Sequence, residues 1–198
     1  MSTSTETPSG EEASARQRLL AAADELFYNE GVHSVGIDRV IDHAGVAKAS
    51  LYRLFGSKEN LIASYLAVRH ERNIAEMRRA VADCDDPRDA ILAIFDVQAR
   101  WLRLDTFRGC PFARATAEPS VGSSVHDALA SYRGAIFQLF EDLAHAAGAD
   151  DPDMLAAQLQ TLYHGADTVL TSSRKDNILD ATRVAVQTLL DASCEGPS

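Results

Sequence analysis

Cysteine and long apolar runs are scarce in this chain, and each scarcity argues against a class of protein. The 198 residues include three cysteines, Cys84, Cys110 and Cys194, at spacings that suit neither a metal site nor a disulfide framework. This cysteine usage favours a reducing, cytoplasmic location. No apolar stretch approaches the roughly 18 residues that a membrane-spanning helix needs. The first ten residues lack the basic and apolar regions of a secretory signal, so we expect no membrane partner and a disordered tail over residues 1–13.

Positive charge is also scarce, because 19 Lys and Arg face 29 Asp and Glu, which gives a net charge of −10. For the chain as a whole, this balance argues against nucleic-acid binding. The balance differs along the sequence, since residues 1–35 carry two cations and six acids whereas residues 36–60 carry four cations and three acids. A binding site can be locally positive on an acidic protein, and residues 36–60 are the segment where we expect one.

Helical periodicity runs through the whole sequence. Apolar residues recur at every third or fourth position and no segment alternates as a strand would, so we predict an all-α fold of about nine helices. Ser14 and Gln17 form a capping box that predicts the start of the first helix. Three short helices come first and about six longer ones follow.

The segment 36–60 has the pattern of a helix-turn-helix. Two short apolar stripes flank Gly45, and a sharp turn favours glycine because glycine accepts a positive φ. The second short helix begins with small or polar residues, so that its backbone can approach base edges, and carries longer polar side chains that can reach phosphates. The candidate DNA contacts are Gly36, Arg39, Lys48, Ala49, Ser50, Tyr52, Arg53 and Lys58.

Residues 14–62 resemble the DNA-binding domain of TetR-family transcriptional regulators. The resemblance is carried by Val35-Gly-Ile-Asp-Arg-Val-Ile and by Ala44-Gly-Val-Ala-Lys-Ala-Ser-Leu-Tyr-Arg-Leu-Phe-Gly-Ser-Lys58. The Ala-Gly-Val turn, the Leu-Tyr-x-x-Phe core and the Ser-Lys start of the fourth helix fall at the family's spacing. Leu54 stands where the family often has histidine, so a frequent phosphate contact is missing. The resemblance implies a helix-turn-helix DNA-binding domain over residues 14–60, a ligand-binding and dimerisation domain over residues 61–198, and double-stranded operator DNA as a partner.

An alternative is that these residues only close a three-helix bundle. Bundle packing explains the apolar positions of the segment, but it does not explain Lys48, Tyr52, Arg53 and Lys58 on the face that the bundle leaves open. We therefore favour DNA binding.

A dimer is expected because one helix in one major groove makes too little contact for tight specific binding. Apolar residues of the last two helices keep a spacing of four and three that suits helix packing, and the resemblance implies a dimer through the same two helices. An intramolecular core would use the same stripes. The candidate interface residues are Leu155, Leu159, Leu162, Ala166, Val169, Ile178, Thr182, Ala185 and Leu189.

The resemblance also implies that the middle helices hold a small-molecule effector. Such sites are apolar with a few polar groups, so a plain core remains the alternative for each aromatic residue. The candidate pocket residues are Trp101, Phe107, Cys110, Phe112, Arg114, Glu118, Tyr132, Phe137, Tyr163, His164 and Asp167.

Cys110 has two interpretations. Pro111 suits the first turn of a helix running to Glu118, which leaves Cys110 at its cap, where the helix dipole and the nearby Arg108 would stabilise a thiolate. A similar Gly-Cys start recurs in part of the family, where some members sense electrophiles or oxidants through a cysteine. The alternative is a small buried residue that packs well.

Enzyme and metal chemistry find little support in the sequence. No phosphate loop, dinucleotide motif or nucleophile elbow is present, and the six histidines form no His-x-x-x-His pair. We therefore expect no catalytic residues, no metal and no cofactor. The favoured interpretation is a homodimeric repressor that binds a palindromic operator and is released by an effector, although activators use the same DNA-reading unit. The alternatives are a helical adaptor protein of the same fold without specific operator binding and a cysteine-based redox or electrophile sensor.

Overall fold

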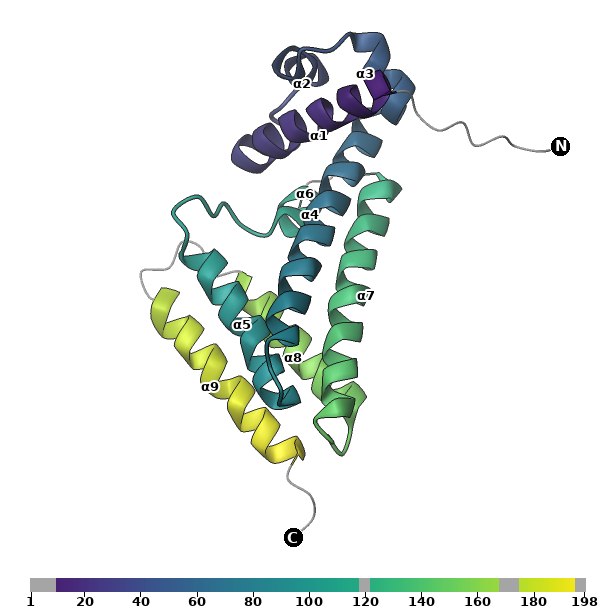
Figure 1. Ribbon diagram of the computed structural model, residues 1–198. Coiled ribbons are helices and arrows are strands. Elements are labelled where there is room, and N and C mark those ends of the chain that lie inside the picture. Colours follow the sequence, from purple (N-terminus) through teal and green to yellow (C-terminus); the bar gives the residue numbers. More distant parts are fainter. Residues whose placement is uncertain (1–9, 118–121, 168–174, 195–198) are drawn as a thin grey trace, which may run out of the picture. The chain divides into compact units, whose positions relative to one another are not determined.

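The computed structural model describes residues 10–117, 122–167 and 175–194, and the described residues are all-α, as predicted (Figure 1). They form nine helices and contain no strand. The helices are α1 (Gly10–Glu30), α2 (Ile37–Ala44), α3 (Lys48–Phe55), α4 (Lys58–Ala82), α5 (Pro87–Arg103), α6 (Pro111–Thr116), α7 (Ser123–Ala146), α8 (Pro152–Ala166) and α9 (Lys175–Cys194).

The chain divides into two compact units. The first unit spans residues up to Val68 together with Pro111–Ala128, and the second spans Arg69–Cys110 together with the residues from Leu129 onward. The first unit therefore contains α1–α3, the beginning of α4, α6 and the beginning of α7. The predicted functional boundary at residue 60 stays a prediction, because a compact unit and a functional domain need not coincide.

The first helix starts earlier than the sequence predicts. α1 begins at Gly10, so the predicted start at Ser14 is wrong and residues 10–13 of the predicted tail are helical; the rest of that tail lies outside the described residues. Glu11 and Glu12 explain the earlier start, because carboxylates in a first turn interact favourably with the positive end of the helix dipole. Glu12 also forms an ion pair with Arg53 of α3, which attaches the first turn of α1 to α3.

Gly45 makes the turn between α2 and α3, as expected. Its φ of 62° is left-handed, and its N–H points at the carbonyls of Ile41 and Asp42 at the end of α2. Leu51 and Phe55 on one side of α3 are buried in the first unit. The opposite side of this short helix is exposed to solvent.

Two contacts within the first unit attach later segments to its helices. Arg114 of α6 donates through Nη1 to the carbonyl of Tyr28, in the last turn of α1, at 2.6 Å. At the start of α7, the backbone N–H of Ser124 donates to Oε1 of Glu59 at 3.1 Å. Both contacts place charge where a helix end favours it, a cation at the carboxyl end of α1 and a carboxylate at the amino end of α7.

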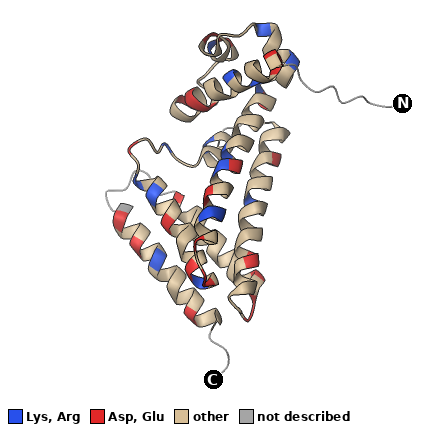
Figure 2. Cartoon of the chain, viewed as in Figure 1, with Lys and Arg blue, Asp and Glu red and all other residues tan. Residues whose placement is uncertain are grey.

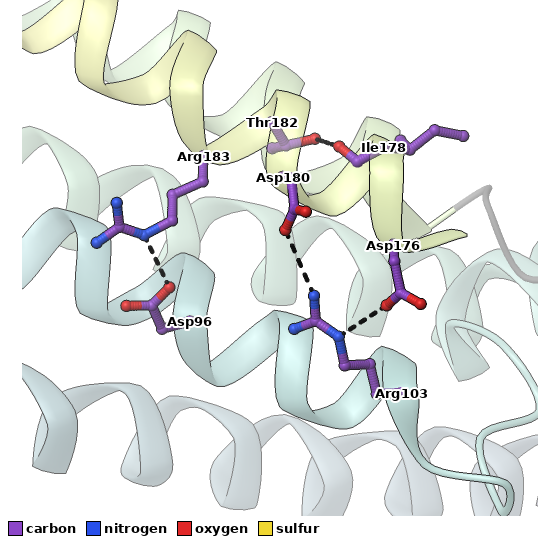
Figure 3. Close-up of polar contacts among 7 residues, drawn as sticks. All are labelled: Asp96, Arg103, Asp176, Ile178, Asp180, Thr182 and Arg183. Atoms are coloured by element: carbon purple, nitrogen blue, oxygen red, sulfur yellow. Dashed lines mark hydrogen bonds and ion pairs between the residues drawn. The ribbon is translucent and has the colours of Figure 1, made fainter. Parts of the chain in front are cut away.

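In the second unit, polar pairs join α5 and α9 along one side (Figure 3). Arg103 lies 2.9 Å from Asp176 and 3.6 Å from Asp180, and Nε of Arg183 lies 3.2 Å from Oδ1 of Asp96. These pairs are largely exposed, and an exposed pair typically contributes about 0–1 kcal/mol. Their main effect is to fix which side of α9 faces α5.

Candidate functional site

The outer side of α3 carries most of the predicted DNA contacts. Lys48 and Ala49 are exposed in its first turn, and 46% of the surface of Tyr52 is exposed one turn later. Ala47, the N-cap of α3, has no side chain that accepts a hydrogen bond from the helix. The first backbone N–H groups of α3 therefore have no side-chain cap. An exposed tyrosine beside an exposed lysine on a short helix is suited to contact with DNA.

The other predicted contacts surround α3 within the first unit. Gly36, the N-cap of α2, is exposed, as are Arg39 and Arg53, whereas Ser50 and Lys58 are half-buried. The structure thus brings these eight residues into one unit, and their role in DNA contact stays a prediction.

Each Lys or Arg of α2 and α3 forms an ion pair with a carboxylate of the same unit. Nζ of Lys48 lies 2.7 Å from Oδ1 of Asp38, and the two Nη atoms of Arg39 lie 2.5 and 2.8 Å from the carboxylate of Glu30. The hydrogen bond and the negative charge of Asp38 raise the pKa of Lys48 above its usual range. Figure 2 shows acidic and basic residues beside one another on α1–α3. The sequence gives the number of cations in this segment, but it does not predict which carboxylates they pair with.

A buried polar cluster lies in the second unit. Gln98, only 2% exposed, donates through Nε2 to the carbonyl of Tyr163 at 2.6 Å and to Oδ1 of Asp167 at 3.0 Å. The imidazole of His164 lies beside Tyr163 and Tyr132, with ring centroids 5.6 and 6.2 Å apart. We call Gln98, Tyr132, Tyr163, His164 and Asp167 the polar cluster.

The electrostatics of the polar cluster follow from burial. Burial raises the pKa of Tyr132 and of Tyr163 well above the usual range, and electrostatic interaction with Asp167 and Cys110 acts in the same direction on both. Both phenols therefore stay protonated and can donate or accept hydrogen bonds. Among the described residues, Nε2 of His164 is buried and has no hydrogen-bond partner.

Five of the predicted pocket residues gather at this cluster: Tyr132, Tyr163, His164 and Asp167 belong to it, and Cys110 is close enough to act on both phenols. Three residues that the sequence analysis missed also belong there: Gln98, His70, whose ring centroid lies 5.5 Å from that of Tyr132, and Asn73, which hydrogen-bonds Tyr132. Gln98 could have been identified from the sequence, because it is a polar residue within the apolar stripe of α5, between Phe95 and Leu102.

The remaining predicted pocket residues lie elsewhere or are not described. Nε1 of Trp101 donates to Glu76 at 3.0 Å, and Phe107 packs against a small buried group around Leu102. Phe112 and Arg114 belong to the first unit, where Phe112 is fully buried and Arg114 is held by the Tyr28 carbonyl, because α6 packs there. Phe137 is half-buried on α7, and Glu118 lies outside the described residues.

An unpartnered apolar surface lies across α8 and α9 and forms an open groove of about 670 Å³. Its apolar lining includes Met154, Ala157, Leu162, Ala185 and Leu189, and we call these five residues the open apolar face. Met154 is 54% exposed, an unusual exposure for a large apolar side chain next to other apolar groups.

The structure divides the predicted interface residues between the open apolar face and the core of the unit, and their role in an interface stays a prediction. Leu162, Ala185 and Leu189 line the open apolar face, but Leu155, Leu159 and Ala166 are at most 2% exposed and pack the core of the unit, because they point from α8 to its opposite side. Ile178 and Thr182 are half-buried on α9, and Thr182 lies on the side that faces α5. Val169 lies outside the described residues.

No helix among the described residues is long and apolar enough to cross a membrane. No group of three or more His, Cys, Asp or Glu side chains within the described ranges is placed to hold a metal ion.

Two short helices joined at a left-handed glycine, with the second helix exposed and basic, define a helix-turn-helix DNA-binding protein. Comparison with known proteins agrees with this class. The family model described as "Bacterial regulatory proteins, tetR family" matches residues 19–65. The solved structure of SCO4454, a TetR-family transcriptional regulator from Streptomyces coelicolor, is 30% identical, covers 92% of this chain and 97% of its own, and superposes with a TM-score of 0.83.

A second structure, a TetR-type regulator from Streptomyces avermitilis, is 31% identical and covers 90% of this chain and 97% of its own, with a TM-score of 0.76. FasR, a transcriptional activator from Mycolicibacterium smegmatis, is 34% identical over 129 residues, which span 63% of this chain and 58% of FasR. The chain belongs to the TetR family and is a transcriptional regulator with a DNA-binding helix-turn-helix.

Proposed function

We propose that the protein is a homodimeric repressor that binds a palindromic operator through α3 and leaves it when a small molecule binds the second unit. The observation that carries this proposal is the exposure of Lys48, Ala49 and Tyr52 on one side of a helix whose other side is buried. In this proposal the first turn of α3 enters the major groove, where Ala49 and Ser50 meet base edges and Lys48 meets a phosphate. Tyr52, Arg53 and Lys58 meet phosphates.

The dimer part of the proposal rests on the three sides of α9. One side pairs with α5 through the ion pairs of Arg103 and Arg183, and a second side is buried in the core. The third side carries Ala185 and Leu189 of the open apolar face. Such a surface is favourable to bury against a second copy, and two copies would present two α3 helices to two half-sites.

The effector part rests on the polar cluster. An apolar surround with a few buried hydrogen-bonding groups is typical of small-molecule sites, and Nε2 of His164 has no partner among the described residues. We infer an amphipathic effector with a hydrogen-bonding group for His164. The segment that ends at Cys110 continues directly into α6, and Arg114 of α6 holds the carboxyl end of α1. A shift of that segment on effector binding would therefore act on the helices that read DNA.

FasR is named an activator and uses the same type of DNA-binding unit, so repression has a test of its own. A reporter gene placed behind the protein's own promoter region provides it. We expect expression to rise when the regulator is deleted. A fall in expression would identify an activator. Because the DNA it would regulate is in the cytoplasm of a bacterium, we propose that location.

Binding to its own promoter region separates a regulator from a helical adaptor of the same fold. We expect tight, salt-dependent binding to one palindromic site and weak binding to a scrambled duplex. Lys48→Ala should weaken operator binding by about tenfold and flatten the salt dependence, because one phosphate or base contact is lost. Binding can be followed by fluorescence anisotropy.

The matched control is Arg79→Ala, which removes the same charge from an exposed position in the second unit. It should leave operator affinity and the salt dependence unchanged. Equal, weak binding of the wild type to both duplexes would favour the adaptor, and an unchanged affinity of Lys48→Ala would remove Lys48 from the contacts.

A second candidate function is sensing of an electrophile or oxidant by Cys110. The observation in its favour is that Cys110 immediately precedes α6 and lies close enough to Tyr132 and Tyr163 to interact electrostatically with both. A change at its sulfur would alter the polar cluster and the segment leading to Arg114 together.

A further inference from the structure

The carboxylates that face the cations of α2 and α3 have no role in the proposed DNA contact itself. Asp38 lies in the first turn of α2 and holds Lys48 at 2.7 Å, and Glu30, the last residue of α1, holds Arg39 through both of its oxygens. These pairs join different helices of one small unit. The partners are nine and ten residues apart in sequence, so they are not neighbours on one helix.

A cation that already has a protein carboxylate behaves differently toward DNA from one surrounded by mobile ions. When a free lysine meets a phosphate, condensed counterions leave the DNA, and this release drives most non-specific binding. When Lys48 meets a phosphate, Asp38 must give up its hydrogen bond, and its negative charge then stays tethered close to the DNA. The pair is exposed, with 57% of the Lys48 side chain and 72% of the Asp38 side chain accessible, so it can open readily.

We propose that Asp38 is a specificity-determining residue that competes with DNA phosphates for the ammonium group of Lys48. The competition lowers the affinity for any duplex, and it lowers non-specific affinity most, because non-specific binding depends almost entirely on charge. At an operator, base-edge contacts by the first turn of α3 hold the helix whether or not Lys48 leaves Asp38, so operator affinity depends less on this competition. This inference rests on the proposed contact between Lys48 and DNA. Glu30 acts on Arg39 in the same way.

The chain offers a matched control for this proposal. Asp42 lies one turn after Asp38 on the same exposed side of the same short helix and carries the same charge, and its carboxylate pairs with no cation in the described part of the chain. Asp38→Asn and Asp42→Asn therefore change the net charge equally, but only the first releases Lys48.

The experiment measures the affinity of the full-length protein for its promoter fragment and for a scrambled duplex of equal length, over a range of salt concentrations. Relative to Asp42→Asn, we expect Asp38→Asn to bind the scrambled duplex about three- to tenfold more tightly and to steepen the slope of log affinity against log salt by about one. Operator affinity should rise less, so the ratio of operator to scrambled affinity should fall. In a Lys48→Ala background the two Asn variants should become equal.

Two results would overturn the proposal. Equal behaviour of Asp38→Asn and Asp42→Asn would show that only total charge matters. Lower operator affinity of Asp38→Asn, with unchanged scrambled-duplex affinity, would show that Asp38 positions Lys48 and does not compete for it.

Glu30→Gln provides an independent variant on another helix, and it should shift both affinities in the same direction as Asp38→Asn. It keeps the test valid if Asp38→Asn lowers the stability of α2. A wild type without preference for the promoter fragment would overturn the proposed function, whereas the comparison of the two Asn variants on the scrambled duplex would still decide the role of Asp38.

Discussion

At the scale of single residues, Cys110 shows how a local pattern can be right in part. The cysteine does precede a helix that begins at Pro111, but that helix ends at Thr116 and is only six residues long. Arg108, which we considered as a charge beside the thiolate, donates to the carbonyl of Asp105 at 2.6 Å. The helix dipole and Arg108 therefore give little support to a thiolate at Cys110, and the sensor hypothesis rests on the position of Cys110 beside Tyr132 and Tyr163.

The sensor hypothesis predicts a difference between the wild type and Cys110→Ser. After treatment with an aldehyde, a quinone or a peroxide, the wild type should release its promoter fragment and the variant should stay bound, because serine lacks the reactive sulfur. Cys84→Ser serves as the control, since Cys84 is also half-buried and forms no disulfide, and it should respond as the wild type does. Identical release by the wild type and Cys110→Ser would end the sensor hypothesis.

At the scale of elements, local sequence patterns account for helix starts. Asp86 and Asp151 cap α5 and α8 with proline in the first turn, because a carboxylate N-cap and a proline each act within one turn. The start of α1 was missed because two acidic residues extended the helix beyond an apparent capping box at Ser14. The periodic apolar stripe of α1, which includes Leu19 and Leu26, is buried.

Packing partners could not be predicted from periodicity. A stripe such as Leu155, Leu159 and Ala166 shows that a helix has an apolar side, but it does not show whether that side meets its own chain or another. The same limit applies to the candidate DNA surface. Exposure of Lys48 followed from the motif, whereas its pairing with Asp38 depends on how α2 packs against α3.

The open apolar face predicts a specific effect on self-association. Met154→Glu places a charge in the groove, and burying that charge at an interface would be costly, so the variant should be a monomer at micromolar concentration by light scattering after size-exclusion chromatography. Leu104→Glu is the matched control, because Leu104 is 55% exposed in the same unit but does not line the groove. It should remain a dimer. Dimers of both variants would place the interface elsewhere.

At the scale of the whole molecule, an acidic protein with a net charge of −10 is proposed to bind a polyanion. Binding is possible despite the net negative charge because the cations are concentrated on a small basic surface around α3. The carboxylates paired with these cations limit the affinity of that surface for DNA of arbitrary sequence. One such surface offers few contacts, so tight binding requires two copies of it. Self-association through α8 and α9 and operator recognition through α3 are therefore parts of one proposal.

The mass of the complex between the full-length protein and its own promoter fragment tests this central claim most directly. Analytical ultracentrifugation of that mixture at near-physiological salt should give two protomers on each duplex that contains the palindrome. The same measurement with half of the palindrome scrambled should show little complex. One protomer bound to each duplex, or no complex with any promoter fragment, would contradict the account.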